Sequence, residues 1–264
     1  GVGSKGSSAR DADFIEYIYP ATMHNTMLFF TAKGRCFWLK VYEIPEGAKN
    51  SKGRAIQNLL NIDSNDAINA CLHIRKLSDP DFCSNHYVMF CTKNGVIKKT
   101  CLSEYSRPRT NGVNAITIRD DDRVVGACLT NGENEIILAN RNGRAIRFAE
   151  DAVRTMGRTA TGVRGMTLDN DGEDEVIGMV CVNDKEKETV MVVSEKGYGK
   201  RSAVDDYRVT NRGGKGVKTL SITEKTGKLV AIKIVTDEHD LMIINKSGIT
   251  LRLNVAGGRV IGRG

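Results

Sequence analysis

The 264-residue chain has few aromatic side chains, 6% of the total with a single tryptophan, and only four prolines. Its longest apolar run, residues 176–182, is seven residues long, far short of the roughly 20 that a membrane-spanning helix needs. A secretory signal is also missing, and the chain starts at Gly1 rather than at a methionine, so we expect a piece of a longer protein. With 40% hydrophobic and 27% charged residues, the composition is that of a folded globular protein.

Metal-binding motifs are missing as well. The seven cysteines form no C-x-x-C pair, and most lie within apolar runs, which is typical of buried, reduced thiols in a cytosolic protein. Cys83 and His86 form an isolated C-x-x-H, and the four histidines show no metal-ligand spacing. We therefore predict neither a metal site nor a cofactor in this chain.

The sequence also lacks a constellation of catalytic residues. G-x-S-x-G does not occur, and the acidic pair Asp205–Asp206 lies in a polar stretch, where solvated or capping carboxylates are the ordinary interpretation. Residues 1–6, GVGSKG, fit G-x-G-x-x-G but follow no strand and open no βαβ unit. Residues 169–175, DNDGEDE, hold acids like those of an EF-hand without its spacing, and they predict a solvated turn. We expect no enzymatic activity from this chain alone.

What the chain does contain is an internal repeat. Five segments share an apolar run, a polar pair, a glycine and a second strand-like run: residues 27–40, 87–100, 135–148, 189–202 and 240–253. The shared glycines are hairpin-turn signals, because glycine tolerates a positive φ angle: Gly34, Gly95, Gly143, Gly197 and Gly248. In each of the first four units a second glycine, a short strand, an acidic turn and another strand follow. We therefore predict four short strands in each of these units.

Four-stranded units at this spacing favour blades arranged around an axis over a sandwich. Helix signals are poor, with only short stretches such as residues 150–155 able to form a turn or two, and WD40 and kelch signatures are absent. We predict a single all-β domain over residues 1–264, a propeller-like disc of about five to six four-stranded blades. Because a ring of blades must close, we expect residues 1–26 to help close it beside the last hairpin.

The positive charge is concentrated on one recurring loop. The chain has 39 Lys and Arg against 32 Asp and Glu, a net charge of +7. The loops that follow the five hairpins hold 14 Lys or Arg and no Asp or Glu: residues 48–60, 106–118, 152–168, 207–222 and 254–264. The rest of the chain has a net charge of −7. Because equivalent loops of successive units lie on one edge, we predict a basic band with the acidic turns away from it.

A band of one sign suits a long polyanion, since each neutralised phosphate releases condensed counterions. Scarce aromatics argue against stacking of single-stranded bases, and no helix presents a row of Arg, Asn or Gln to a major groove. These features predict contact with the backbone of duplex DNA and weak sequence specificity. Residues 211–216, NRGGKG, combine close backbone approach with the charges of Arg212 and Lys215, and they predict a phosphate-binding loop.

The candidate DNA contacts are basic residues of the loops, basic residues at the ends of the strands, and the glycines of the NRGGKG loop. They are Lys5, Lys52, Arg54, Lys98, Lys99, Arg107, Arg109, Arg144, Arg147, Arg158, Arg164, Lys200, Arg201, Arg212, Gly213, Gly214, Lys215, Gly216, Lys218, Arg259 and Arg263.

Several stretches resemble the family of DNA gyrase A C-terminal domains, which are parts of a type IIA topoisomerase, and the resemblance covers nearly the whole chain. They are NGVIKKT (94–100), RAIRF (144–148), MGRTATGVRGM (156–166), KGYGKRSAVDDY (196–207) and GRVIGR (258–263). The resemblance implies a β-pinwheel, around whose basic rim double-stranded DNA wraps. It also implies partners, the rest of gyrase A and the gyrase B protein, which together introduce negative supercoils at the expense of ATP.

By the same resemblance, ATP and magnesium belong to other parts of the parent enzyme, no membrane is involved, and the location is the bacterial cytoplasm, with the nucleoid. The family's hallmark is the box Q-R-R-G-G-K-G ahead of the first hairpin, where this sequence keeps only Gly3-Ser4-Lys5-Gly6. Residues 210–216, TNRGGKG, match five of the seven box positions but belong to a later blade, so the role of the box is not assigned to them.

Three alternatives stay open. One is the C-terminal domain of the gyrase A counterpart in topoisomerase IV, a sibling family without the box and with a looser ring. Another is a protein-interaction propeller whose basic band meets an acidic partner. The third is a blade-type enzyme with a site at its central channel, which would need converging carboxylates or metal ligands at equivalent positions of the repeats.

Overall fold

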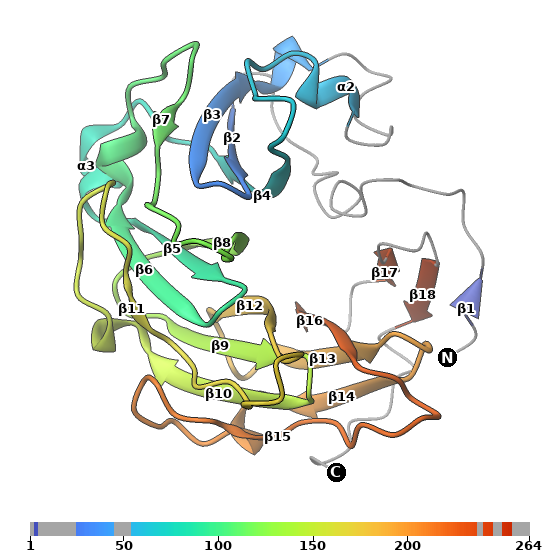
Figure 1. The fold of residues 1–264 in the computed structure, drawn as a ribbon. Coiled ribbons are helices and arrows are strands. Elements are labelled where there is room, and N and C mark those ends of the chain that lie inside the picture. Colours follow the sequence, from blue (N-terminus) through green and yellow to red (C-terminus); the bar gives the residue numbers. More distant parts are fainter. Residues whose placement is uncertain (1–2, 5–24, 45–53, 237–239, 245–249, 255–264) are drawn as a thin grey trace.

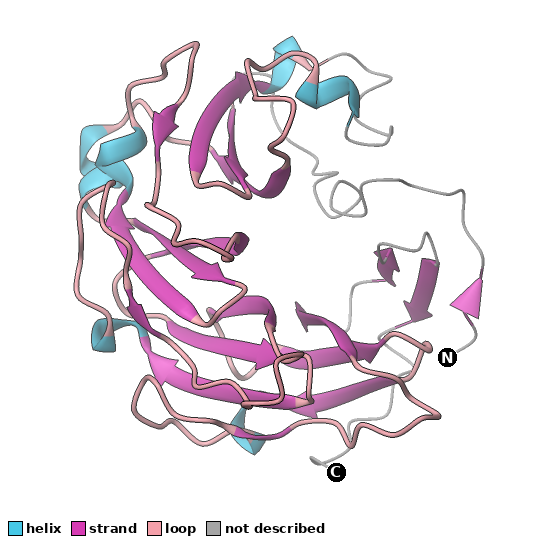
Figure 2. Ribbon diagram, viewed as in Figure 1, coloured by secondary structure: helices cyan, strands magenta, loops and turns pink. Residues whose placement is uncertain are grey.

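The computed structural model describes residues 3–4, 25–44, 54–236, 240–244 and 250–254. Its regular elements are almost all short antiparallel strands, grouped into small sheets that follow one another around a centre (Figure 1). Strands dominate over the few short helices (Figure 2). The prediction of an all-β, propeller-like architecture with four-stranded blades is confirmed.

Three sheets have four strands each within the described residues. The first has the order β4 (Ile68–Ile74), β2 (Thr26–Thr31), β3 (Arg35–Lys40) and β7 (Val113–Asn114). The second has the order β8 (Val124–Thr130), β5 (Tyr87–Thr92), β6 (Val96–Cys101) and β11 (Val163–Arg164). The third has the order β12 (Val176–Val182), β9 (Glu135–Asn140), β10 (Arg144–Ala149) and β15 (Val217–Lys218).

Two further sheets have three described strands each. One has the order β16 (Leu229–Val235), β13 (Thr189–Ser194) and β14 (Gly199–Ala203). The other has the order β17 (Asp240–Ile244), β18 (Thr250–Asn254) and β1 (Gly3–Ser4). Of residues 1–26, the segment expected to close the ring, only 3–4 and 25–26 are described, and Gly3 and Ser4 pair with Leu251 and Thr250 of β18.

The outermost strand of each four-stranded sheet comes from the following unit of the sequence. In the first three units the hairpin and the innermost strand are close in sequence, whereas β7, β11 and β15 lie in the loops that follow the next hairpin. These three strands run along the periphery of the molecule, and β4, β8, β12 and β16 face its centre (Figure 1). Each of these three blades is therefore completed by a strand of the unit that follows it.

The core lies between adjacent blades. The innermost strands contact each other in sequence order, β4 with β8, β8 with β12 and β12 with β16. The first two blades pack through an aromatic cluster in which the rings of Phe30 and Phe90 meet edge to face at 4.9 Å, with Tyr105 beside both. Packing on both faces buries these hairpin strands along nearly their whole length, and they read as continuous apolar runs rather than alternating ones. Adjacent blades cover both faces of β5 and β9, whereas β2 packs on the second blade with one face and on its own unit, including Ile56 and Leu60, with the other.

Short helices connect these strands. A 3₁₀ turn follows the second hairpin strand of each of the first four units: Val41–Glu43, Leu102–Tyr105, Glu150–Ala152 and Val204–Asp206. Within the described residues the α-helical segments are α2 (Arg54–Gln57) and α3 (Pro80–Ser84), the latter capped by the Asp79 carboxylate. In the described part of the chain, no helix has the length and apolar character to cross a bilayer.

Candidate nucleic-acid interface

The outermost strands are held at the rim by a repeated pair of hydrogen bonds to the hairpin glycine. The carbonyl of Gly95 accepts from the N–H groups of Gly165 at 2.7 Å and Met166 at 3.2 Å, directly after β11. The same two bonds recur after the other outer strands, from Ala115 (2.8 Å) and Ile116 (3.2 Å) to Gly34 and from Thr219 (2.7 Å) and Leu220 (3.2 Å) to Gly143. The backbone of each rim loop is therefore seated in the same way on its blade.

This seat requires glycine. Gly95 has a φ angle of 92°, and a Cβ atom there would lie 2.6 Å from the carbonyl oxygen of Met166. Gly34 and Gly143 have the same φ angle, 93°, and the same close approach, at 2.2 and 2.4 Å. The hairpin glycines of the sequence repeat thus make the turn and also admit the rim strand of the neighbouring unit.

The three described rim loops, residues 106–118, 152–168 and 207–222, carry an exposed basic surface without acidic residues. Seven of their cations are exposed and have no side-chain hydrogen bond or ion pair to any described residue: Arg107, Arg109, Arg154, Arg164, Arg208, Lys215 and Lys218. We call these seven the rim cations. Within these loops, then, positive charge is free to meet a partner in solution.

Three further predicted arginines lie at the rim with their guanidinium groups bound to protein carbonyls. Arg144 donates to Gly216 at 3.2 Å. Arg158 donates to Asn114 at 3.4 Å. Arg212 donates from Nη1 to the carbonyl of Arg164 and from Nε to that of Ala152, at 2.6 and 3.1 Å, so it is shared between two backbone groups.

Within the NRGGKG loop, glycine is needed for the backbone conformation. Gly213 and Gly216 have φ angles of 95° and 77°, and Gly214 is exposed. The Gly213 N–H donates to the Gly165 carbonyl at 2.9 Å. The loop therefore presents Lys215 to solvent while Gly213 contacts the preceding rim loop.

Five predicted contacts at the strand ends are buried, so the structure corrects their assignment to the exposed band. They are Lys98, Lys99, Arg147, Lys200 and Arg201, with relative exposures of 0 to 6%. The sequence places them at the ends of hairpins, but the strands that carry them, β6, β10 and β14, are buried along most of their length. The charged groups of Lys98, Lys99, Arg147 and Arg201 turn to acceptors inside the protein.

Lys98 shows the pattern most clearly. Its Nζ donates to the carbonyl of Ala115 at 2.5 Å and to that of Arg158 at 2.7 Å, and thereby ties two successive rim loops from inside. Burial, assisted by the nearby charge of Arg158, lowers the pKa of Lys98 to about 7. The amine also lies 5.6 Å from the centre of the Phe90 ring.

Lys99 is paired with a fully buried carboxylate. Its Nζ lies 3.2 Å from Oε2 of Glu150. Glu150 also accepts from the Thr130 hydroxyl at 2.6 Å and from the N–H groups of Gly132 and Asn134 at 3.0 and 3.1 Å. These donors satisfy the carboxylate and make Lys99 part of the core rather than of the rim.

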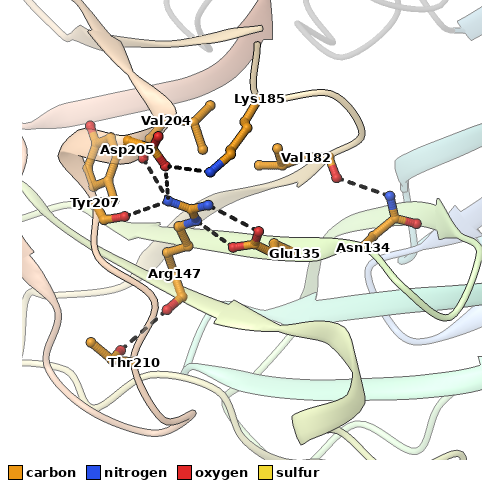
Figure 3. A network of polar contacts seen from close by, with 9 residues as sticks. All are labelled: Asn134, Glu135, Arg147, Val182, Lys185, Val204, Asp205, Tyr207 and Thr210. Atoms are coloured by element: carbon orange, nitrogen blue, oxygen red, sulfur yellow. Dashed lines mark hydrogen bonds and ion pairs between the residues drawn. The ribbon is translucent and has the colours of Figure 1, made fainter.

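Arg147 anchors the network shown in Figure 3. Its guanidinium group binds Glu135 through two hydrogen bonds, contacts Asp205 at 3.2 Å, and donates to the carbonyls of Val204 and Tyr207 at 3.1 and 2.8 Å. Arg201 makes a related contact, with Nε donating to Thr189 Oγ1 at 2.7 Å. Neither side chain faces solvent.

Some predicted contacts lie outside the described residues, namely Lys5, Lys52, Arg259 and Arg263, and for Arg54 only its backbone in α2 is described. The predicted set also missed Arg154 and Arg208, which are exposed rim cations. A signal for them exists in the sequence, because each stands four residues before Arg158 or Arg212 in an R-x-x-x-R repeat.

The acidic turns serve the scaffold. One carboxylate per turn caps a hairpin: Oδ1 of Asp66, Asp122 and Asp174 accepts from the N–H groups of Lys33, Asn94 and Asn142 at 3.1, 2.9 and 3.2 Å. Residues 169–175 are thus held as a turn by their own hydrogen bonds, some of them through Asp171. Among the described residues, no group of three His, Cys, Asp or Glu could hold a metal ion, and the seven cysteines, all of which are described, form no disulfide.

The fold and the rim together define a class, a β-pinwheel built of interlocked blades with a basic periphery. A sequence profile described as "DNA gyrase C-terminal domain, beta-propeller" matches residues 25–75, 86–130, 134–183 and 188–236. The chain belongs to this family.

Comparisons with individual proteins agree. The DNA gyrase A proteins of Staphylococcus aureus strains NCTC 8325 and COL are each 41% identical over 256 residues, which is 97% of this chain and 28% of each relative. The chain thus spans less than a third of the length of these relatives. Among solved structures, the C-terminal domain of DNA topoisomerase IV matches with a TM-score of 0.77 and 27% identity, covering 91% of this chain and 73% of that one. A DNA gyrase A C-terminal domain matches with a TM-score of 0.76, covering 92% and 76% of the two chains; at 23% identity this likeness concerns the fold.

Proposed function

We propose that this chain binds double-stranded DNA and bends it around its rim, as the DNA-wrapping part of a gyrase A protein. The observation that carries the proposal is the set of seven rim cations, which lie exposed on three successive loops without an acidic neighbour in those loops. A curved duplex following the periphery would meet these cations in turn, and the carbonyl seats on Gly34, Gly95 and Gly143 hold the loops at the same place on each blade. The 41% identity to gyrase A proteins favours gyrase over topoisomerase IV as the parent enzyme.

The chain takes part in supercoiling as a binding element in this proposal. ATP hydrolysis, magnesium binding and strand cleavage are assigned to other parts of a complex with the gyrase B protein, in the bacterial cytoplasm and at the nucleoid. The chain alone is then expected to bind DNA without added ATP or Mg²⁺. The contacts go to phosphates, so binding should depend little on sequence.

A salt titration tests the proposal. If about six to ten phosphates are neutralised, affinity for a duplex should fall on the order of 10³–10⁵-fold between about 50 and 200 mM salt. Replacing Arg107 and Arg109 together with Gln should lower the slope of log affinity against log salt by about 2 for any duplex sequence, at about 0.9 per phosphate. A flat titration would overturn the proposal, and loss of binding to one sequence alone would indicate base reading instead.

A topology assay tests wrapping separately from binding. The chain is incubated with relaxed closed circular DNA and a relaxing topoisomerase, and the linking number is read after the protein is removed. A shift that grows with protein concentration is expected from wrapping. Salt-dependent binding without any shift would limit the function to binding, and a tight complex with an acidic protein in place of DNA would favour the interaction propeller.

A further inference from the structure

Two of the rim loops contain the same pair of arginines, four residues apart, and the two members of the pair have different surroundings. Arg154 and Arg208 come first and are exposed rim cations. Arg158 and Arg212 come second, are half-buried, and point back along the rim to the loop before their own. This difference in exposure and contacts indicates that the first and second arginines have different roles, although they cannot be distinguished from the sequence alone.

Arg212 holds two carbonyls of the preceding rim loop. Its Nη1 donates to Arg164 of β11 at 2.6 Å, and its Nε donates to Ala152 at the start of the same loop at 3.1 Å. A planar guanidinium fork suits two acceptors held at a fixed separation, which a lysine ammonium does not reproduce. Arg212 therefore connects the two ends of one loop with the middle of the next.

Arg158 makes the corresponding contact one unit earlier. Its Nη1 donates to the carbonyl of Asn114 at 3.4 Å, and its Nε lies 3.9 Å from a carboxylate oxygen of Glu104. Asn114 and Arg164 occupy the same position, the second residue, of β7 and β11. Each arginine thus reaches the same backbone oxygen of the outer strand before it.

Threonines make a parallel set of bonds between the same loops. Thr117 donates from Oγ1 to the carbonyl of Thr159 at 2.6 Å, and from its N–H to that of Ala160 at 3.2 Å. Thr167 repeats both bonds one unit later, to Gly213 at 2.6 Å and to Gly214 at 2.9 Å. The three described rim loops are therefore joined in series.

We infer that Arg158 and Arg212 are positioning residues, which hold successive rim loops at a fixed spacing and so set the curved path along which Arg154, Arg208 and the other rim cations meet DNA phosphates. The inference rests on the proposed DNA-wrapping function. Bending a duplex stores elastic energy, so loops that shift independently under that load would bind DNA without curving it. Charge at the second arginine matters less in this arrangement than the two carbonyls that it connects.

The test compares two variants that remove the same charge from the same loop, Arg208→Gln and Arg212→Gln. Affinity for a short duplex is measured against salt, and bending is read at saturating protein from energy transfer between dyes at the ends of a longer duplex. Arg208→Gln should lower the salt slope by about 0.9 with a small change in transfer. Arg212→Gln should lower transfer clearly more, with a smaller change in slope, and Arg212→Lys should restore the slope without restoring transfer.

A measurement made without DNA distinguishes the positioning role of Arg212 from the proposed DNA-wrapping function. Amide hydrogen exchange at Thr167 and Gly213, whose N–H groups bridge the two loops, should become faster in Arg212→Gln and stay near the wild-type rate in Arg208→Gln. Equal exchange and equal bending in the two glutamine variants, or full rescue of bending by Arg212→Lys, would overturn the inference. A wild-type chain that neither binds nor bends DNA would overturn the proposed function, whereas the exchange result would still decide whether Arg212 holds the loops. If Arg212→Gln does not fold, Arg158→Gln is compared with Arg154→Gln in the same way, with exchange read at Thr117.

Discussion

The guanidinium group of Arg147 meets the carboxylate of Glu135 through two parallel hydrogen bonds, Nε to Oε2 at 2.6 Å and Nη2 to Oε1 at 3.0 Å (Figure 3). Arg147 pairs with Ile137 across the β9–β10 hairpin, so Glu135 is its diagonal neighbour, and Arg147 is 4% exposed. The guanidinium group of Arg147 is therefore bound within the protein, although the residue lies in a basic hairpin end where a DNA contact would be expected from the sequence.

Arg147→Met should therefore destabilise the fold and leave the salt dependence of DNA binding unchanged. The substitution removes the Arg147 donor from the Tyr207 carbonyl and both hydrogen bonds to Glu135, whereas the Val204 carbonyl keeps the N–H of Tyr207. A buried acceptor that loses its donor costs about 1–3 kcal/mol. Urea unfolding and a salt titration of duplex binding measure the two effects. Arg164→Met is the matched control, for which we expect the reverse pattern, a slope lower by about 0.9 and stability within about 0.5 kcal/mol of wild type.

Glu150→Ala should be among the most damaging substitutions in the chain. It leaves the buried Lys99 ammonium without its carboxylate partner and removes the acceptor of three other donors. Breaking a buried ion pair in this way costs about 3–5 kcal/mol. The free energy of unfolding of Glu150→Ala is compared with that of Lys99→Met and of the double variant. We expect the double variant to lose less than the sum of the two single losses, since no unpaired charge remains; simple additivity would contradict the buried pair.

Gly95→Ala should loosen the second blade. The alanine would have to keep the positive φ angle of Gly95, and its Cβ would lie 2.6 Å from the carbonyl oxygen of Met166. The rim strand must then move outward, at a cost on the order of 1–3 kcal/mol. Gly157→Ala provides the control, because nothing lies within 4 Å of a Cβ there, and its stability should stay within about 0.5 kcal/mol of wild type. Thermal unfolding of the two variants side by side checks the difference, and equal midpoints would argue against the tight seat.

Lys98 should make stability rise with pH above neutrality. Its pKa of about 7 in the folded protein lies below the ordinary value of 10.5, so between these values the unfolded chain holds a proton that the folded chain lacks. Stability contributed by this group therefore grows as pH rises from about 7 and is flat below it, where both states are protonated. The slope is measured as the difference in unfolding free energy between wild type and Lys98→Met at about pH 6.5 and pH 9. A difference that does not change with pH would contradict the lowered pKa.

The blades could be predicted from the sequence because the residues that define their hairpins are close together in the chain. The glycine turns at Gly34, Gly95 and Gly143 and the apolar runs before them identify the hairpins, and the basic loops are visible from composition. The burial of Lys98 and Arg147 was not within reach, because it depends on which blade covers the strand and on distant acceptors such as Ala115 and Tyr207. For the same reason the sequence could not separate Arg208 from Arg212, which differ only in what the fold brings beside them.

The donation of each outermost strand to the preceding blade has a consequence for how such a protein can change. A blade here is not a module with its own boundaries, because removing the 50 or so residues of one unit would take an edge strand from the blade before it. Loss of one unit should therefore expose a bare sheet edge next door, with its tendency to pair with other chains. We therefore expect the number of units in such proteins to change only when the whole ring is rebuilt or when units are gained or lost at the ends of the chain. Deleting one unit from within the ring should yield an aggregating protein rather than a shorter folded one.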